Sequence, residues 1–115
     1  SKKLPVGKRE ILLVQNVTWL TSSYLLNSSD TTPRSSGYVV VSGQPSPNST
    51  VTSGSIQFLP KAQLKRPSFS KSAIKLYIDI DFMPMTLHQL TQPKRYLWIG
   101  NFGNGHIYGD LHSTN

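Results

Sequence analysis

The chain has 115 residues, of which 37% are hydrophobic and 15% charged, with a net charge of +7. This length fits one small domain with a modest core, and the lack of cysteine excludes disulfides, thiol chemistry and a cysteine zinc site. No apolar run reaches the ~20 residues of a membrane span, so we expect no membrane partner. The excess of Lys and Arg favours an anionic partner instead.

The first segment, residues 1–10, is basic and contains Pro5 and Gly7. This composition is typical of a linker or arm, and we expect a single β domain over residues 11–115. Because the chain begins SKKLPVGKRE without a methionine, we also expect it to be a domain excised from a longer protein.

Short runs of strand-forming residues recur along the rest of the chain, separated by Gly, Pro, Asn and Ser. The expected strands are, in chain order, 11–20, 38–43, 55–60, 73–83, 95–100 and 106–111. The polar stretches 28–37 and 44–54 are expected as loops, and 84–93 as a single helical turn between two prolines. This pattern predicts an all-β fold: a small antiparallel β-sandwich, jelly-roll-like, or a barrel.

The clearest alternation lies in AIKLYIDIDFM, residues 73–83. Hydrophobic residues fall on one face of this expected strand and polar residues on the other. The predicted buried face consists of Ile74, Leu76, Ile78, Ile80 and Phe82.

The opposite face of this strand carries Asp79 and Asp81, with Cα atoms roughly 6–7 Å apart. A carboxylate pair serves glycoside hydrolysis or cation binding, but Asp-x-Asp alone supplies no acid held in an apolar pocket. Lys75 on the same face favours a solvated surface. The histidines lack metal-ligand spacing, so we predict no enzyme, metal or cofactor.

Basic residues gather in the second half of the chain, and the predicted basic patch consists of Lys61, Lys65, Arg66, Lys94 and Arg95. Tyr96 and Trp98 follow directly. Aromatic rings beside cations are typical of single-stranded nucleic-acid binding, which requires both on one exposed face. The alternative is that these basic residues form a solvated surface that binds no nucleic acid.

The late stretch RYLWIGNFGNGHIYGD is rich in aromatic residues and glycine. Leu97 and Ile99 form the natural core pair, which places Tyr96 and Trp98 on an outer face or in a subunit interface. Asn104-Gly105 favours a tight hairpin turn. A sugar ring stacked on Trp98 would have hydrogen-bonding groups around it. The predicted ligand-binding residues are Tyr96, Trp98, Asn101, Asn104, His106, Tyr108 and Asp110.

The order of these motifs resembles the C-terminal receptor-binding or baseplate domains of siphophage tail proteins that infect Gram-positive bacteria. The matching stretches are Gly37–Val41, Phe58–Lys61 and Arg95–Gly105. The resemblance implies a β-sandwich, usually trimeric, at the tip of a phage tail, where it adheres to cell-wall saccharides.

We therefore expect a non-catalytic adhesion module of the virion tail. It would bind a host cell-surface polysaccharide, with or without phosphate groups, as a homo-oligomer, with a trimer favoured, and alongside other tail proteins. Two alternatives stay open: a basic β-barrel that binds nucleic acid, and a purely structural domain of tail assembly.

Overall fold

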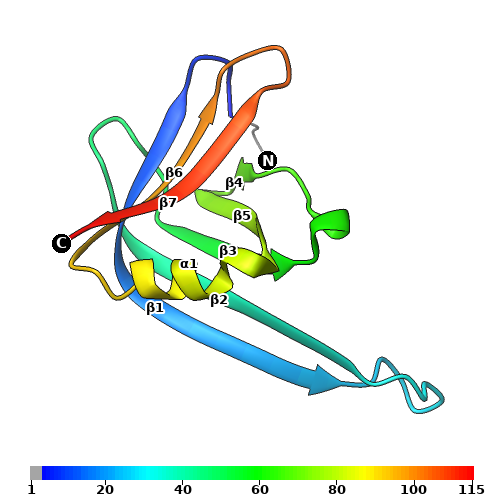
Figure 1. The fold of residues 1–115 in the computed structure, drawn as a ribbon. Coiled ribbons are helices and arrows are strands. Elements are labelled where there is room, and N and C mark those ends of the chain that lie inside the picture. The colour runs from blue at the N-terminus through cyan, green and yellow to red at the C-terminus, as the bar shows by residue number, and fades with distance from the viewer. Residues whose placement is uncertain (1–3) are drawn as a thin grey trace.

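The computed structural model describes residues 4–115, and β-strands dominate it (Figure 1). This confirms the predicted all-β class. The strands are β1 (Arg9–Tyr24), β2 (Arg34–Pro45), β3 (Ser53–Leu59), β4 (Ser68–Ser70), β5 (Ala73–Asp79), β6 (Lys94–Asn101) and β7 (Ile107–Thr114). The helical segments are η1 (Lys61–Gln63), η2 (Ile80–Phe82) and α1 (Met83–Gln89).

The seven strands form one sheet in the order β4-β5-β3-β2-β1-β6-β7. Neighbouring strands are antiparallel except β3 and β5, which are parallel. The parallel pair departs from the antiparallel pattern expected from the sequence. Its physical basis is the long connection between Leu59 and Ala73, because a parallel pair needs a crossover of about a dozen residues or more. The short edge strand β4 lies within that connection and has no clear sequence signal.

The sheet curls so that its two halves face each other across the core (Figure 1). A Cβ atom added at Gly54 of β3 would lie 2.2 Å from a methyl carbon of Leu97 on β6. Strands that are three places apart in the sheet are therefore in van der Waals contact. Between the halves lies the hydrophobic core, which consists of Leu4, Leu12, Val14, Val39, Val41, Val51, Ile56, Ile74, Leu76, Leu90, Leu97, Ile99 and Leu111.

Helix α1 follows β5 and packs beside β7, where Gln89 Nε2 donates a hydrogen bond of 2.8 Å to the Leu111 carbonyl. Thr86 and Leu90 are buried there. Among residues 4–115, no helix is long and apolar enough to cross a membrane.

The strand expected over residues 73–83 ends early, at Asp79. The Asp79 side chain accepts a hydrogen bond of 3.0 Å from the Asp81 backbone N–H and so caps η2. Ile80 and Phe82, predicted to be buried, are therefore 45% and 53% exposed. A carboxylate that bonds the backbone two residues ahead favours a turn over a continued strand.

Residues 4–10 of the basic N-terminal segment pack on the domain, and residues 1–3 lie outside the described residues. Leu4 belongs to the core, and β1 already begins at Arg9. Glu10 is buried and accepts hydrogen bonds from the backbone N–H groups of Thr50, at 2.6 Å, and Val51, at 2.9 Å. This carboxylate fastens the loop between β2 and β3 to β1.

Strand β1 is twice as long as most of the others, and only its first part has a neighbour on both sides. Strand β6 pairs with it from Arg9 to Leu13, whereas β2 pairs with it from Leu12 out to Tyr24. Asn16–Tyr24 and Arg34–Ser42 therefore form a ribbon that projects from the body of the domain (Figure 1); β3 pairs with it as far as Tyr38, and only the part beyond is two-stranded. The radius of gyration, 15.3 Å, exceeds the ~13 Å expected for a compact chain of this length.

Candidate aromatic binding platform

The outer face of β6 and β7 carries most of the aromatic residues of the late stretch. Leu97 and Ile99 point into the core. Alternation along the strands therefore turns Tyr96 and Trp98 outward. The register pairs Tyr96 with His112 and Trp98 with Asp110, so side chains of both strands share this face.

Six aromatic rings lie on this face, four in one group of ring contacts and two in a separate stacked pair. Trp98 lies at the centre of the larger group, with ring-centre distances of 5.8 Å to Phe102 and 5.6 Å to Tyr108. These spacings are typical of favourable aromatic pairs. Phe102 extends the set to His106, and Tyr96 stacks on His112. We call this set the aromatic platform; it consists of Tyr96, Trp98, Phe102, His106, Tyr108 and His112.

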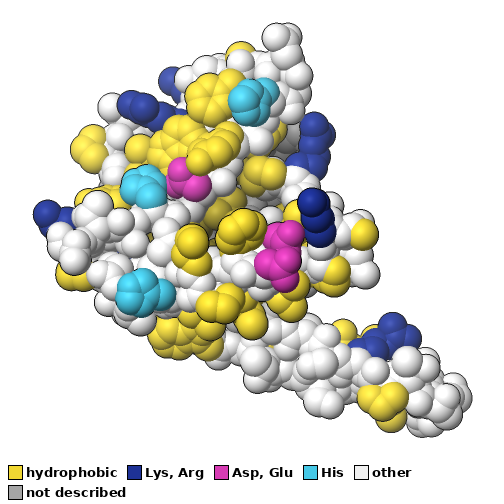
Figure 2. Space-filling view, in the orientation of Figure 1, with side chains coloured by type: hydrophobic (Ala, Val, Ile, Leu, Met, Phe, Trp, Pro, Cys, Tyr) yellow, Lys and Arg dark blue, Asp and Glu magenta, His cyan; other side chains and the backbone are white. Residues whose placement is uncertain are grey.

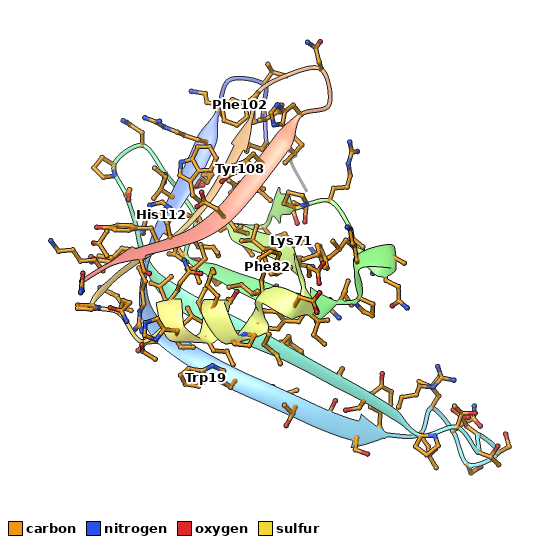
Figure 3. All side chains as sticks on the ribbon, in the orientation of Figure 1. Trp19, Lys71, Phe82, Phe102, Tyr108 and His112 are labelled. Atoms are coloured by element: carbon orange, nitrogen blue, oxygen red, sulfur yellow. The ribbon has the colours of Figure 1, made fainter. Side chains whose placement is uncertain are left out.

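Four rings of the platform are exposed: Phe102, at 58%, and Tyr108, at 47%, together with His106 and His112. Figure 2 shows hydrophobic side chains gathered over β6 and β7, with histidines and an acidic group among them and Lys or Arg at their border. Figure 3 shows Phe102, Tyr108 and His112 in a line along this face. The surface thus offers apolar ring faces with polar groups at their edges.

Trp98 keeps its place because the residue at position 100 has no side chain. A Cβ atom at Gly100 would come within 2.7 Å of the Trp98 Cη2 atom. The indole therefore lies along its own strand, over the backbone of Gly100. This arrangement presents the ring as part of a broad surface.

Asp110 joins two of the rings by hydrogen bonds. The Tyr108 hydroxyl donates to Asp110 Oδ2 at 3.1 Å, and Nδ1 of His112 lies 2.9 Å from Asp110 Oδ1. The hydrogen bond to Asp110, together with its negative charge, raises the pKa of the Tyr108 phenol above its ordinary value. Tyr108 is therefore a neutral hydrogen-bonding group throughout the physiological range.

An open hollow of about 440 Å³ borders the platform at the N-terminal side of the domain. Trp98 and Phe102 line it from the platform, and Lys8 and Arg9 line it from the start of β1. Lys8 and Arg9 are both exposed. The hollow therefore places two cations beside two aromatic rings.

Five of the seven predicted ligand-binding residues come together on this face: Tyr96, Trp98, His106, Tyr108 and Asp110. Asn101 lines the hollow, but its side chain is bonded to the backbone. Its Nδ2 donates a hydrogen bond of 2.8 Å to the Leu4 carbonyl, and its Oδ1 accepts one of 3.0 Å from Gly103 N–H. Asn104 lies in the β6–β7 turn, where positive φ angles of 54° at Asn104 and 77° at Gly105 fit the expected hairpin.

The predicted basic patch is not a single surface. Arg95 donates hydrogen bonds to the backbone carbonyls of Val14 and Gln15, at 3.2 Å each, and to that of Leu90. Its guanidinium group therefore has a structural role between β1 and the end of α1. Lys94 lies beside it, at the start of β6.

The other three basic residues lie elsewhere, in the connection between β3 and β5. Lys65 sits over the Tyr77 ring, with Nζ 5.7 Å from the ring centre, and Lys61 begins η1. Arg66 reaches toward Gly105 in the turn beyond the far end of β6. The length of β6 thus separates Arg66 from Lys94.

Four residues of the site were missed by the sequence analysis: Phe102, His112, Lys8 and Arg9. His112 could have been found, because it continues the alternation of Tyr108 and Asp110 along β7. Phe102 looked like part of a turn. Lys8 and Arg9 have no local signal, because only the pairing of β1 with β6 brings them to the platform.

The Asp79 and Asp81 side chains do not form a pair on one strand face, because Asp79 ends β5 and Asp81 lies in η2. Within the described part of the chain, no three His, Cys, Asp or Glu side chains are grouped to hold a metal ion.

A scan against protein-family models finds no match for this chain, and searches of curated proteins and of solved structures find no significant match. The function is therefore inferred from the geometry of the platform.

Proposed function

We propose that this protein is a non-catalytic adhesion module that binds a cell-surface polysaccharide on the aromatic platform. The observation that carries the proposal is the joined surface of Trp98, Phe102 and Tyr108, with Asp110 at its edge. A sugar ring has an apolar face and a rim of hydroxyl groups. Aromatic faces beside a few well-placed polar groups are suited to both features.

The distribution of carboxylates supports binding without cleavage. Glycoside hydrolysis uses two carboxyl groups about 5–10 Å apart. Of the five acidic residues in the chain, only Asp110 lies on the platform. Glu10 is buried and bonded to the β2–β3 loop, and the other three lie at the ribbon tip and around η2.

The hollow beside Trp98 favours a saccharide that carries phosphate groups. Lys8 and Arg9 can form charge-assisted hydrogen bonds to a phosphate while a neighbouring sugar stacks on the rings. The setting we propose is the tail domain that the sequence resembles, with a Gram-positive cell wall as the surface that is bound and other tail proteins as partners.

Nucleic-acid binding is the rival function, and the platform is less suited to it. A nucleic-acid strand carries a phosphate at every nucleotide and needs cations along its path. Asp110, hydrogen-bonded to Tyr108 and His112 on the platform, would repel such a strand, and most predicted basic residues lie away from it.

Two phenylalanines of similar exposure provide a matched test. Phe102 is 58% exposed on the platform, and Phe82 is 53% exposed near α1. We expect Phe102→Ala to abolish measurable binding to purified wall teichoic acid and Phe82→Ala to leave it unchanged, in isothermal titration at two salt concentrations. Binding to single-stranded DNA alone, or equal loss in both variants, would contradict the proposal.

A further inference from the structure

The β1 side of the ribbon is an open strand edge. Strand β6 pairs with β1 only as far as Leu13. At the next two residues, Val14 and Gln15, the backbone carbonyls accept hydrogen bonds from the guanidinium group of Arg95 instead of from β6. From Asn16 to Tyr24, no strand within residues 4–115 pairs with this edge. We call Asn16–Tyr24 the open edge.

The open edge lacks the usual protection against pairing with another strand. In native proteins, charged side chains, a proline or a very short strand prevent an edge strand from pairing with another chain. The open edge runs for nine residues, NVTWLTSSY, and contains neither a charge nor a proline. The β2 side of the ribbon is different, because β3 covers it from Tyr38 and its short free part carries Arg34.

The ribbon also exposes apolar side chains. Trp19 is 56% exposed, and Leu20 and Val40 are 40% exposed each; Figure 3 shows Trp19 on the outside of β1. Beyond Tyr38 the ribbon has only two strands, and an isolated pair of strands is only marginally stable in water. Pairing with a further strand would satisfy the free backbone groups of β1 and place side chains against Trp19 and Leu20.

The charge distribution indicates which partner pairs with the open edge. Between Ile11 and Pro60 the only charged residues are Asp30 and Arg34, which form an ion pair of 3.5 Å at the ribbon tip. The ribbon is thus neutral, and the net charge of +7 lies elsewhere. Two copies of a strongly basic protein repel each other through their bodies, whereas two ribbons meet without that repulsion.

We propose that the open edge pairs with the open edge of a second copy of this chain, in antiparallel orientation. Each copy then contributes the same residues to the interface, and the two copies are related by two-fold symmetry, so no third copy can add to this edge. Nine residues at about 3.4 Å each give a contact about 30 Å long. The product is a dimer in which the sheets of the two copies join edge to edge through β1, in contrast to the trimer that the sequence resemblance implies. It leaves the aromatic platform of each copy free.

The first test uses two leucines of equal exposure, Leu20 at 40% and Leu64 at 41%. Sedimentation velocity of the full chain should give twice the single-chain mass of 12.8 kDa. A lysine on an edge strand opposes pairing. Leu20→Lys should therefore sediment as a monomer and Leu64→Lys as a dimer. Circular dichroism confirms that both variants are folded.

The second test depends on cross-linking rather than on disruption. The chain has no cysteine, so single cysteines placed in turn at residues 19–23 can form disulfides only between copies. Antiparallel neighbours bring Cα atoms near the axis within the range of a disulfide. We expect one or two of these variants to cross-link almost fully, and Ser70→Cys on the edge strand β4 to give no cross-linked product.

Three results would overturn the proposal. The first is a monomeric wild-type chain at every concentration up to its solubility limit. The second is a mass three times that of the single chain. The third is a dimer that survives Leu20→Lys while none of the ribbon cysteines cross-links.

Discussion

The indole of Trp98 lies over Gly100, where a Cβ atom would come within 2.7 Å of its Cη2 atom. We therefore expect Gly100→Ala to move the indole and leave the strand in place. Because the shift breaks up the aromatic platform, saccharide binding should weaken by about tenfold, or about 1.4 kcal/mol. Near-ultraviolet circular dichroism and isothermal titration measure the two effects.

The matched control for this substitution is Gly37→Ala, because a Cβ atom there would have only ordinary contacts of 3.7 Å. It should change neither the aromatic circular dichroism nor the affinity. If Gly100→Ala behaves in the same way, the indole does not depend on position 100.

A second prediction concerns Tyr108 and pH. Its pKa is raised by the hydrogen bond to Asp110 and by that carboxylate's charge. A raised phenol pKa means that the interaction stabilises the fold fully below the unfolded-state pKa and is lost as pH rises through the folded-state pKa. Asp110→Asn should therefore lower the pKa of Tyr108.

NMR titration of tyrosines labelled at the Cζ carbon measures this change, with Tyr108→Phe to assign the signal. The other four tyrosines serve as internal references. A Tyr108 pKa that is the same with Asn and with Asp at position 110 would show that the hydrogen bond is not formed in solution.

A third prediction concerns the buried carboxylate of Glu10. It accepts hydrogen bonds from two backbone N–H groups, at Thr50 and Val51. Glu10→Ala leaves these donors without their partner and should lower the free energy of unfolding by about 2–3 kcal/mol. Glu10→Gln keeps an acceptor and should cost less. Urea unfolding followed by circular dichroism measures the free energy of unfolding of both variants. Equal decreases in the two variants would show that they result from lost packing alone.

A fourth prediction separates two neighbouring basic residues. Arg95 bonds three backbone carbonyls, whereas Lys94 is exposed at the start of β6. Arg95→Ala should destabilise the protein by about 2 kcal/mol, and Lys94→Ala by less than about 0.5 kcal/mol. Thermal unfolding compares them. Similar midpoints for the two variants would refute the structural role of Arg95.

Local alternation in the sequence was sufficient to predict much of the platform. In RYLWIG the pattern separates Leu97 and Ile99, which are buried, from Tyr96 and Trp98, which face outward. The same reasoning failed at Ile80, because alternation continues past Asp79 while the backbone does not. The hydrogen bond that the Asp79 side chain accepts from the backbone competes with strand formation. A hydrophobicity pattern contains no information about this bond.

Other features depend on contacts that are distant in the sequence. Lys8 and Arg9 reach the platform only because β1 pairs with β6, some 90 residues later. Arg95 looked like a surface cation, and its three carbonyl partners become visible only when the bulge in β1 meets the end of α1. The open edge likewise follows from where β6 ends, which no local pattern in NVTWLTSSY indicates.

The most direct test of saccharide binding on the platform uses the two tryptophans of the chain. Each gives one indole N–H signal in a proton–nitrogen NMR spectrum, and Trp19→Phe assigns them. On addition of purified wall teichoic acid, the Trp98 signal should shift in proportion to saturation, while the Trp19 signal on the ribbon stays in place. A shift of the Trp19 signal alone, or no shift of either signal at saturating polysaccharide, would contradict the proposed function.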